Sequence, residues 1–205
     1  MDYNQLASLD SLQKTKDSLS QKGYEVFVVK NKTEALEKIK ELIPEGASVM
    51  NGSSATLEQI GYLDYLKSGA HKWVDLHAKV TAESDKEKRT KLRRESVLSD
   101  YYLGSVHALA ETGEFVIASN TGSQLPHVVY TSPNLIFVVS TKKIVPTLDE
   151  AMRRLKEYVY PLEDKQSLEK YKEHTAINKI VIFNGEVSYS GRKIRFILVE
   201  EDLGF

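Results

Sequence analysis

The sequence predicts an α/β protein with a sheet of mainly parallel strands and helices packed on it. In the N-terminal part of the chain, segments with apolar residues at helical spacing alternate with short, continuously apolar runs. Parallel strands need a long crossover between them, and a helix is the usual crossover, so this alternation favours a parallel sheet.

The elements follow from periodicity, turn residues and helix caps. Leu6, Leu9, Leu12 and Leu19 lie near one stripe and predict a helix over residues 3–22. In the first half of the chain we then expect a strand over 24–29, a helix over 33–43, a strand over 47–50, a helix capped by Ser53 or Ser54, a helix or turn over 62–69 and a strand over 72–77. An exposed charged helix should follow within 81–100, and then strands over 103–110, 115–119 and 135–139. The last elements should be a helix from Thr147 to about residue 160 and strands over 179–183 and 194–200. Pro161 should end its helix, leaving 161–176 irregular or partly helical.

Length and composition limit the class of protein. The 205 residues predict one domain over 1–205, with 1–22 as a helix packed on it. A net charge of −1 argues against nucleic acid as a partner, since nucleic-acid binders usually have a strong basic excess. No apolar run reaches the roughly 18 residues that span a bilayer, and the N-terminus does not resemble a signal peptide. We therefore expect a cytoplasmic protein with no membrane partner.

The residue types that usually hold metals are scarce. The chain contains no cysteine, which excludes disulfides, a thiol nucleophile and thiolate ligation of zinc or an iron–sulfur cluster by this chain. Its five histidines show no HExxH motif and no other close pair on one helix face. We expect no metal site and no cofactor held by this chain.

A predicted hairpin carries the candidate catalytic residue. Apolar runs flank Glu111-Thr112-Gly113-Glu114, and Gly113 can take the positive φ of a tight turn. Glu111 stands where the first apolar strand ends, so it is a candidate general base, a role that needs a pKa raised by partial burial. Thr112 and Gly113 complete this part of the candidate site. An ordinary hairpin followed by a surface loop would explain the same residues, and both interpretations stay open.

Loops of small polar residues are candidate anion-binding segments. One follows a strand and opens a helix, where free N–H groups and the helix dipole favour an anion, although a plain capped helix start has the same pattern. Lys143 lies near the carboxyl end of a strand, the edge at which open α/β sheets place ligands. The candidate ligand-binding residues are Asn51, Gly52, Ser53, Ser54, Thr121, Gly122, Ser123 and Lys143, with Thr112 and Gly113 of the hairpin.

The order of these motifs resembles the LUD-domain family, which is named for lactate utilisation. The resemblance rests on the run from Asn51 to Gly61, on Ser105 to Gly113, on Asn120-Thr121-Gly122-Ser123, on Lys143-Ile144-Val145 with the following Leu148-Asp149-Glu150-Ala151, and on the ending Leu203-Gly204-Phe205. It spans nearly the whole chain.

The resemblance implies a fold and a set of partners. The family is similar to the superfamily of ribose-5-phosphate isomerase, glucosamine-6-phosphate deaminase and coenzyme A transferases (NagB/RpiA/CoA transferase-like). This implies a Rossmann-like open sheet with an antiparallel insertion, and a homodimer. Family members occur with iron–sulfur proteins in the oxidation of L-lactate to pyruvate, so a redox role would need such a partner. The chain departs from many relatives at His107-Ala108, where they have Asn-Ala, and at Gly122-Ser123-Gln124, where they have Gly-Asn-Arg.

Three hypotheses for the function follow. In the first, the protein binds a small organic anion or phosphorylated metabolite as a component of lactate utilisation, with Glu111 as base and Lys143 neutralising charge. In the second, it is a non-catalytic subunit that binds an iron–sulfur redox partner. In the third, it is a metabolite-sensing module. The sequence leaves open whether the protein is an enzyme.

Overall fold

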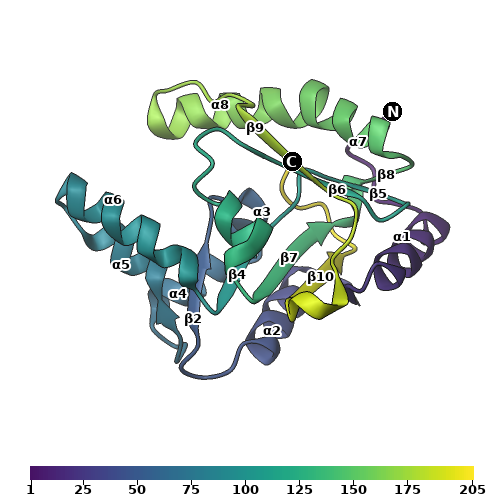
Figure 1. The fold of residues 1–205 in the computed structure, drawn as a ribbon. Coiled ribbons are helices and arrows are strands. Elements are labelled where there is room, and N and C mark those ends of the chain that lie inside the picture. Colours follow the sequence, from purple (N-terminus) through teal and green to yellow (C-terminus); the bar gives the residue numbers. More distant parts are fainter.

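The computed structural model describes residues 1–205 and contains two sheets (Figure 1). The central sheet has six strands in the order β1-β10-β7-β4-β2-β3, and every pair in it is parallel. The second sheet has the order β8-β5-β6-β9 and is mixed, since β6 runs antiparallel to both neighbours. The strands are β1 (Glu25–Val29), β2 (Ser48–Asn51), β3 (Val74–Asp75), β4 (Tyr101–Gly104), β5 (Ala108–Ala110), β6 (Phe115–Ser119), β7 (Asn134–Ser140), β8 (Ile144–Val145), β9 (Lys179–Phe183) and β10 (Lys193–Val199).

Helices cover both sheets. The α-helices are α1 (Leu9–Gln21), α2 (Lys32–Leu42), α3 (Ala55–Gln59), α4 (Tyr62–Ser68), α5 (Leu76–Ala82), α6 (Lys86–Glu95), α7 (Leu148–Arg154) and α8 (Tyr160–Tyr171). Single turns of 3₁₀-helix occur at η1 (Ser96–Leu98), η3 (Thr141–Lys143) and η5 (Ser188–Ser190), and π-turns at η2 (His127–Thr131) and η4 (Leu155–Val159). None of these helices combines the length and the apolar character needed to cross a bilayer.

The core divides into layers because side chains alternate between the two faces of each strand. One face of the central sheet packs on α2, α3 and α4 through residues such as Ile39, Leu57 and Val138. Its other face packs on the second sheet, with α1 contributing Leu12. The outer face of the second sheet packs on α7 and η4 through residues such as Val116. The predicted α/β architecture with an antiparallel insertion is therefore confirmed.

Aromatic rings join the two sheets. Phe115 of β6 stacks on Phe183 of β9, with ring centroids 4.6 Å apart and an interplanar angle of 4°. The same ring meets Phe137 of β7 and Phe196 of β10 at 5.4 and 5.2 Å. Phe115 is fully buried, and its ring packs between the second sheet and the central sheet.

The predicted strand over 103–110 is wrong, because the chain changes sheet within it. β4 ends at Gly104 in the central sheet, and β5 begins at Ala108 in the second sheet. Residues 105–107 form the crossing between the two sheets. Apolar residues occupy both halves, since each half is buried in its own sheet, and a hydrophobic pattern cannot distinguish one long buried strand from two short ones.

The predicted end of a helix at Pro161 is also wrong. Backbone angles stay helical from α7 through η4 into α8, so one continuous helix extends from Leu148 to Tyr171. Pro161 lies in the first turn of α8, directly after the π-turn, where a missing N–H group is tolerated. Residues 161–176, which we expected to be irregular or partly helical, are helical as far as Tyr171.

Smaller differences occur at element ends. The first helix begins only at Leu9, because the Ser8 side chain accepts a hydrogen bond from the Ser11 N–H and caps it there. The strand predicted over 72–77 is limited to Val74–Asp75, since Asp75 caps α5. The exposed charged helix predicted within 81–100 is confirmed as α6, which has no buried residue, and α5 precedes it.

We expect Phe115→Ala to destabilise the protein strongly, because it removes the ring shared by both sheets. Loss of a fully buried phenylalanine typically costs about 3–5 kcal/mol. Urea denaturation followed by circular dichroism measures the change. Tyr189→Ala is the control, since that ring is 90% exposed and its loss should change stability by less than about 0.5 kcal/mol. Similar stabilities for the two variants would contradict this role of Phe115.

Candidate functional site

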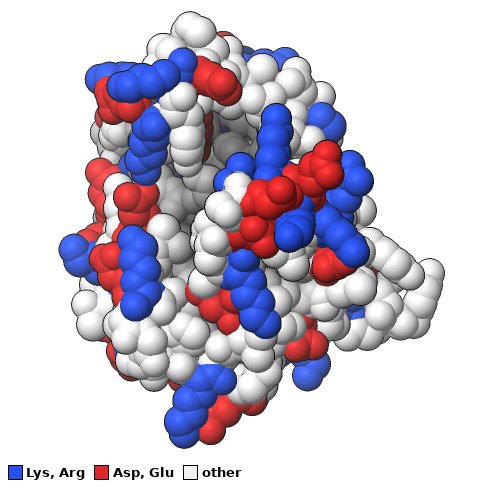
Figure 2. All heavy atoms as spheres, turned by 90° about the vertical axis from the view of Figure 1, so that its left-hand side faces the viewer, with Lys and Arg blue, Asp and Glu red and all other residues white.

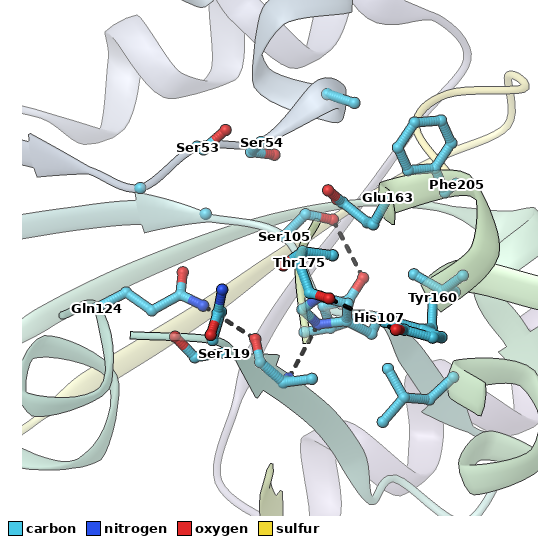
Figure 3. A pocket seen from close by; sticks show the side chains of 18 of the residues that line it. Ser53, Ser54, Ser105, His107, Ser119, Gln124, Tyr160, Glu163, Thr175 and Phe205 are labelled. Carbon is cyan, nitrogen blue, oxygen red and sulfur yellow. Dashed lines mark hydrogen bonds between the residues drawn. The ribbon is translucent and has the colours of Figure 1, made fainter. Parts of the chain in front are cut away.

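A cavity of about 260 Å³ lies at the carboxyl edge of the central sheet, between that edge and the helix formed by η4 and α8 (Figure 3). One wall is built by the segments that leave the ends of β2 and β4, together with Lys143. The opposite wall comes from Leu155, Val159, Tyr160 and Glu163, and residues 175–177 also line the cavity. Figure 2 shows that the adjoining face carries acidic and basic side chains side by side and is hollowed in its upper part.

Lys143 is the cationic side chain that lines the cavity, and it is 4% exposed. Its Nζ lies 3.0 Å from Thr56 Oγ1, 3.1 Å from Ser105 Oγ and 3.3 Å from the Val106 carbonyl oxygen. These three acceptors match the three hydrogens of an ammonium group. The hydroxyls themselves have only long hydrogen bonds within the protein, from Thr56 to Ser105 Oγ and from Ser105 to the Val106 carbonyl oxygen, both at 3.5 Å.

Burial lowers the pKa of Lys143 to about 7. Desolvation is the largest cause, because the charged form loses its hydration. The positive charges of Arg154 and Lys142 act in the same direction, whereas the negative charge of Glu163 opposes them. Lys143 therefore changes protonation close to neutral pH, where an arriving anion favours the charged form.

The loop after β2 brings backbone N–H groups to the cavity. Ser54 caps α3 by accepting from the Leu57 N–H at 3.3 Å. The N–H groups of Ser53, Ser54 and Ala55 make no hydrogen bond within the protein. Gly52 lets this loop lie close to its neighbours, since a Cβ at this position would come within 2.6 Å of Tyr102 Oη. The small residues thus leave backbone donors available at the cavity.

His107 lines the cavity as a neutral donor. Burial, with the charges of Lys143 and Arg154, lowers its pKa to about 3. Its Nδ1 lies 3.2 Å from the Ala118 N–H and accepts from it, which assigns the ring hydrogen to Nε2. Arg154 is fully buried and donates to the carbonyl oxygen of His107, which fixes the crossing at 105–107.

The π-turn η4 shapes the opposite wall. Tyr160 N–H donates to the Leu155 carbonyl five residues back, so the helix carries an extra residue in this turn. Leu155 and Val159 lie before Pro161, and Glu163 lies after it, yet all three line the same cavity. π-turns are frequently found at functional sites.

The structure gathers part of the predicted site. The lining includes Gly52, Ser53, Ser54, Thr121, Ser123 and Lys143. Asn51 and Gly122 lie beside it without lining it. The Asn51 side chain is buried and donates to the carbonyl oxygen of Gly52, and Gly122 has a φ of +84°.

The hairpin residues Glu111, Thr112 and Gly113 lie outside the cavity lining. A Cβ on Gly113 would meet the Lys22 side chain and the backbone of Ser18, so this turn lies against the C-terminal end of α1. Glu111 therefore does not line this cavity with Lys143, because β5 lies between it and the crossing that forms the cavity wall.

Sequence reasoning did not select Thr56, Ser105, His107 or Glu163 as site residues. Ser105 and His107 stood inside a segment interpreted as one strand, although their polar side chains within an apolar run were a signal of the crossing. Glu163 stood in a segment that was expected to be irregular or partly helical. Thr56 belongs to the loop already selected and extends it by two residues.

These features define an α/β protein with a polar cavity at the carboxyl edge of a parallel sheet. The family model for the LUD domain matches residues 12–181, and the chain therefore belongs to the LUD-domain family. This confirms the resemblance that the motifs indicated.

One solved structure supports the fold, and a second aligns with about half of the chain. A DUF162 family protein from Deinococcus radiodurans is similar, with 16% identity and a TM-score of 0.58, over 95% of this chain and 99% of that one. Ribose 5-phosphate isomerase A from Neisseria gonorrhoeae aligns over 57% of this chain and 54% of its own, with 15% identity and a TM-score of 0.36. No curated protein matches the chain.

We expect Gly204→Ala to disturb the surroundings of Lys143. Gly204 has a φ of +66°, and a Cβ there would collide with Thr56 Oγ1 and lie 3.0 Å from Lys143 Nζ. Gly46→Ala is a matched control, with a φ of +80° and no atom within 4 Å of an added Cβ. The control should lose about 1–2 kcal/mol from backbone strain alone, and Gly204→Ala should lose more in urea denaturation. Equal losses would mean that this close approach is not a constraint.

The lowered pKa of Lys143 should make stability depend on pH. Between about pH 7, where the folded lysine loses its proton, and the unfolded pKa of about 10.4, the unfolded chain binds one more proton. The free energy of unfolding should therefore rise with pH in this window, by up to about 1.4 kcal/mol per unit. Urea denaturation at several pH values should show this rise in the native protein, and Lys143→Met should lack it. The exposed Lys67→Met variant should keep it, and a rise retained in Lys143→Met would contradict the assignment.

Proposed function

We propose that the cavity binds the anionic group of a small organic anion or phosphorylated metabolite, and that the protein serves lactate utilisation, for which its family is named. The observation that carries this proposal is the buried Lys143 amine with the Thr56 and Ser105 hydroxyls beside it. A lysine is rarely buried without a carboxylate partner, and this one has only neutral acceptors. A bound anion would supply the missing negative charge.

The hydroxyls extend the reach of the lysine. Nζ donates to Thr56 Oγ1 and Ser105 Oγ, and the two hydroxyls donate within the protein only over 3.5 Å, so their hydrogens can turn to a ligand oxygen at shorter distance. A carboxylate or phosphate oxygen would then accept hydrogen bonds polarised by a cation, which are stronger than those from an isolated hydroxyl.

Other neutral donors support the same chemistry. Ser53, Ser54 and His107 line the same cavity, and the backbone N–H groups of the two serines and the neutral imidazole of His107 offer donors without adding charge. Several uncharged donors around one titrating amine suit an anion whose charge is spread over two or three oxygens.

The size of the cavity limits the ligand. Its volume of about 260 Å³ lies below the roughly 300–1,000 Å³ of typical ligand pockets. It suits a hydroxy acid or a sugar phosphate better than a whole coenzyme or dinucleotide.

We expect Lys143→Met to weaken anion binding at least tenfold. A thermal-shift and calorimetry screen with L-lactate, inorganic phosphate and sugar phosphates tests this, because a ligand at a hundredfold excess over its Kd stabilises the native state by about 2.7 kcal/mol. Binding should weaken by up to tenfold per unit above about pH 7, because the anion needs a proton on Lys143.

Glu111→Gln is the control, since Glu111 lies outside the cavity. Unchanged affinity in Lys143→Met would contradict the proposal. A loss confined to Glu111→Gln would place the site at the hairpin.

A further inference from the structure

Glu163 is the acidic side chain in the cavity lining. It comes from α8, whereas Ser105 and His107 come from the crossing at residues 105–107, and Figure 3 shows all three side chains at the cavity. The side chain makes no hydrogen bond and no ion pair, in contrast to Glu58 and Glu114, which pair with Lys170 and Lys22. A partly buried carboxylate without a partner is unfavourable in a folded protein. Its position therefore calls for a reason other than stability.

Glu163 of α8 and Lys143 line the same cavity. No ion pair within 4 Å joins them, yet each charge shifts the pKa of the other group. Burial raises the pKa of Glu163, and Lys143 opposes this rise. The two groups are thus the basic end and the acidic end of one polar lining, and no ion pair joins them.

The two ends offer different chemistry. At the Lys143 end, hydroxyl and N–H groups are donors, which suit an anion. At the opposite end, the Glu163 carboxylate offers acceptor oxygens, which repel an anion and need a donor. A ligand that fits both ends carries an anionic group and, a few bonds away, a hydrogen-bond donor.

A hydroxyl is the donor that fits best. A ligand ammonium beside Glu163 would be repelled by Lys143 and Lys170, whose positive charges already act on that carboxyl group. A hydroxyl brings no charge and donates one hydrogen bond to an acceptor carboxylate.

We propose, on the basis of the proposed anion site, that Glu163 determines specificity by accepting a hydrogen bond from a hydroxyl of the bound ligand, so that the cavity selects hydroxylated organic anions. Glu163 is then a ligand-binding residue. The π-turn η4 positions it, because the extra residue in that turn sets which side chains of α8 point toward the cavity.

Matched ligand pairs test this proposal by calorimetry with the full chain. L-lactate is compared with propionate, and glycerol 3-phosphate with propyl phosphate, because the members of each pair differ in hydroxyl groups alone. The native protein should bind the hydroxylated member of at least one pair about tenfold or more tightly, as expected when a buried acceptor would otherwise be left unpaired.

Three variants isolate the residue. Glu163→Met keeps the length of the side chain without an acceptor, and it should bind both members of a pair equally. Glu163→Gln keeps an acceptor oxygen and should retain part of the preference. Glu169→Met is the matched control on the same helix, where the side chain is exposed, and it should behave as the native protein does. Circular dichroism checks that each variant is folded.

The outcomes separate this inference from the proposed function. If the native protein binds neither member of either pair, the anion site itself is refuted. If both members bind equally well, or if Glu163→Met keeps the native preference, the role of Glu163 is overturned while the anion site stands. Tighter binding of L-alanine than of L-lactate would overturn the choice of a hydroxyl.

Discussion

The arrangement of this protein depends on two chain crossings that lie side by side and are joined by one buried lysine. The chain leaves the central sheet for the second sheet after β4, at residues 105–107, and again after β7, at 141–143. Lys143, at the end of the second crossing, donates to Ser105 Oγ and to the Val106 carbonyl in the first. The same contacts hold two sheets together and build one wall of the cavity.

A buried lysine is an unfavourable residue for the contact between the two crossings, because it lowers the stability of the folded protein. An ammonium group loses hydration on burial, and here only neutral oxygens replace it, while Arg154 and Lys142 add positive charge nearby. A hydrophobic side chain would give a more stable joint. The proposed binding of an anion in the cavity would explain why a lysine occupies this buried position.

The opposite wall depends on irregularity within a helix. An ordinary α-helix would be interrupted at Pro161, but the π-turn before it lets one helix pass along the whole cavity. The helix contributes apolar side chains to the core at one end and Glu163 to the cavity. One wall of the cavity is therefore positioned by the two crossings of the chain between the sheets, and the other wall is positioned by the helix formed by η4 and α8.

The local pattern of residues was sufficient to predict much of the fold. Helical periodicity, caps such as Ser54 and Thr147, and apolar runs predicted most elements and the parallel sheet, because these signals arise from neighbours in the chain. They also selected the loops at residues 51–54 and 121–123, and Lys143. Only the tertiary structure separated Lys143 from Glu111 and joined it to Ser105, His107 and Glu163. That choice depends on which sheet each half of 103–110 enters and on how the helix passes Pro161. Both are decided by contacts between distant segments, such as the seating of Phe115 between the sheets, which leave no local period in the sequence.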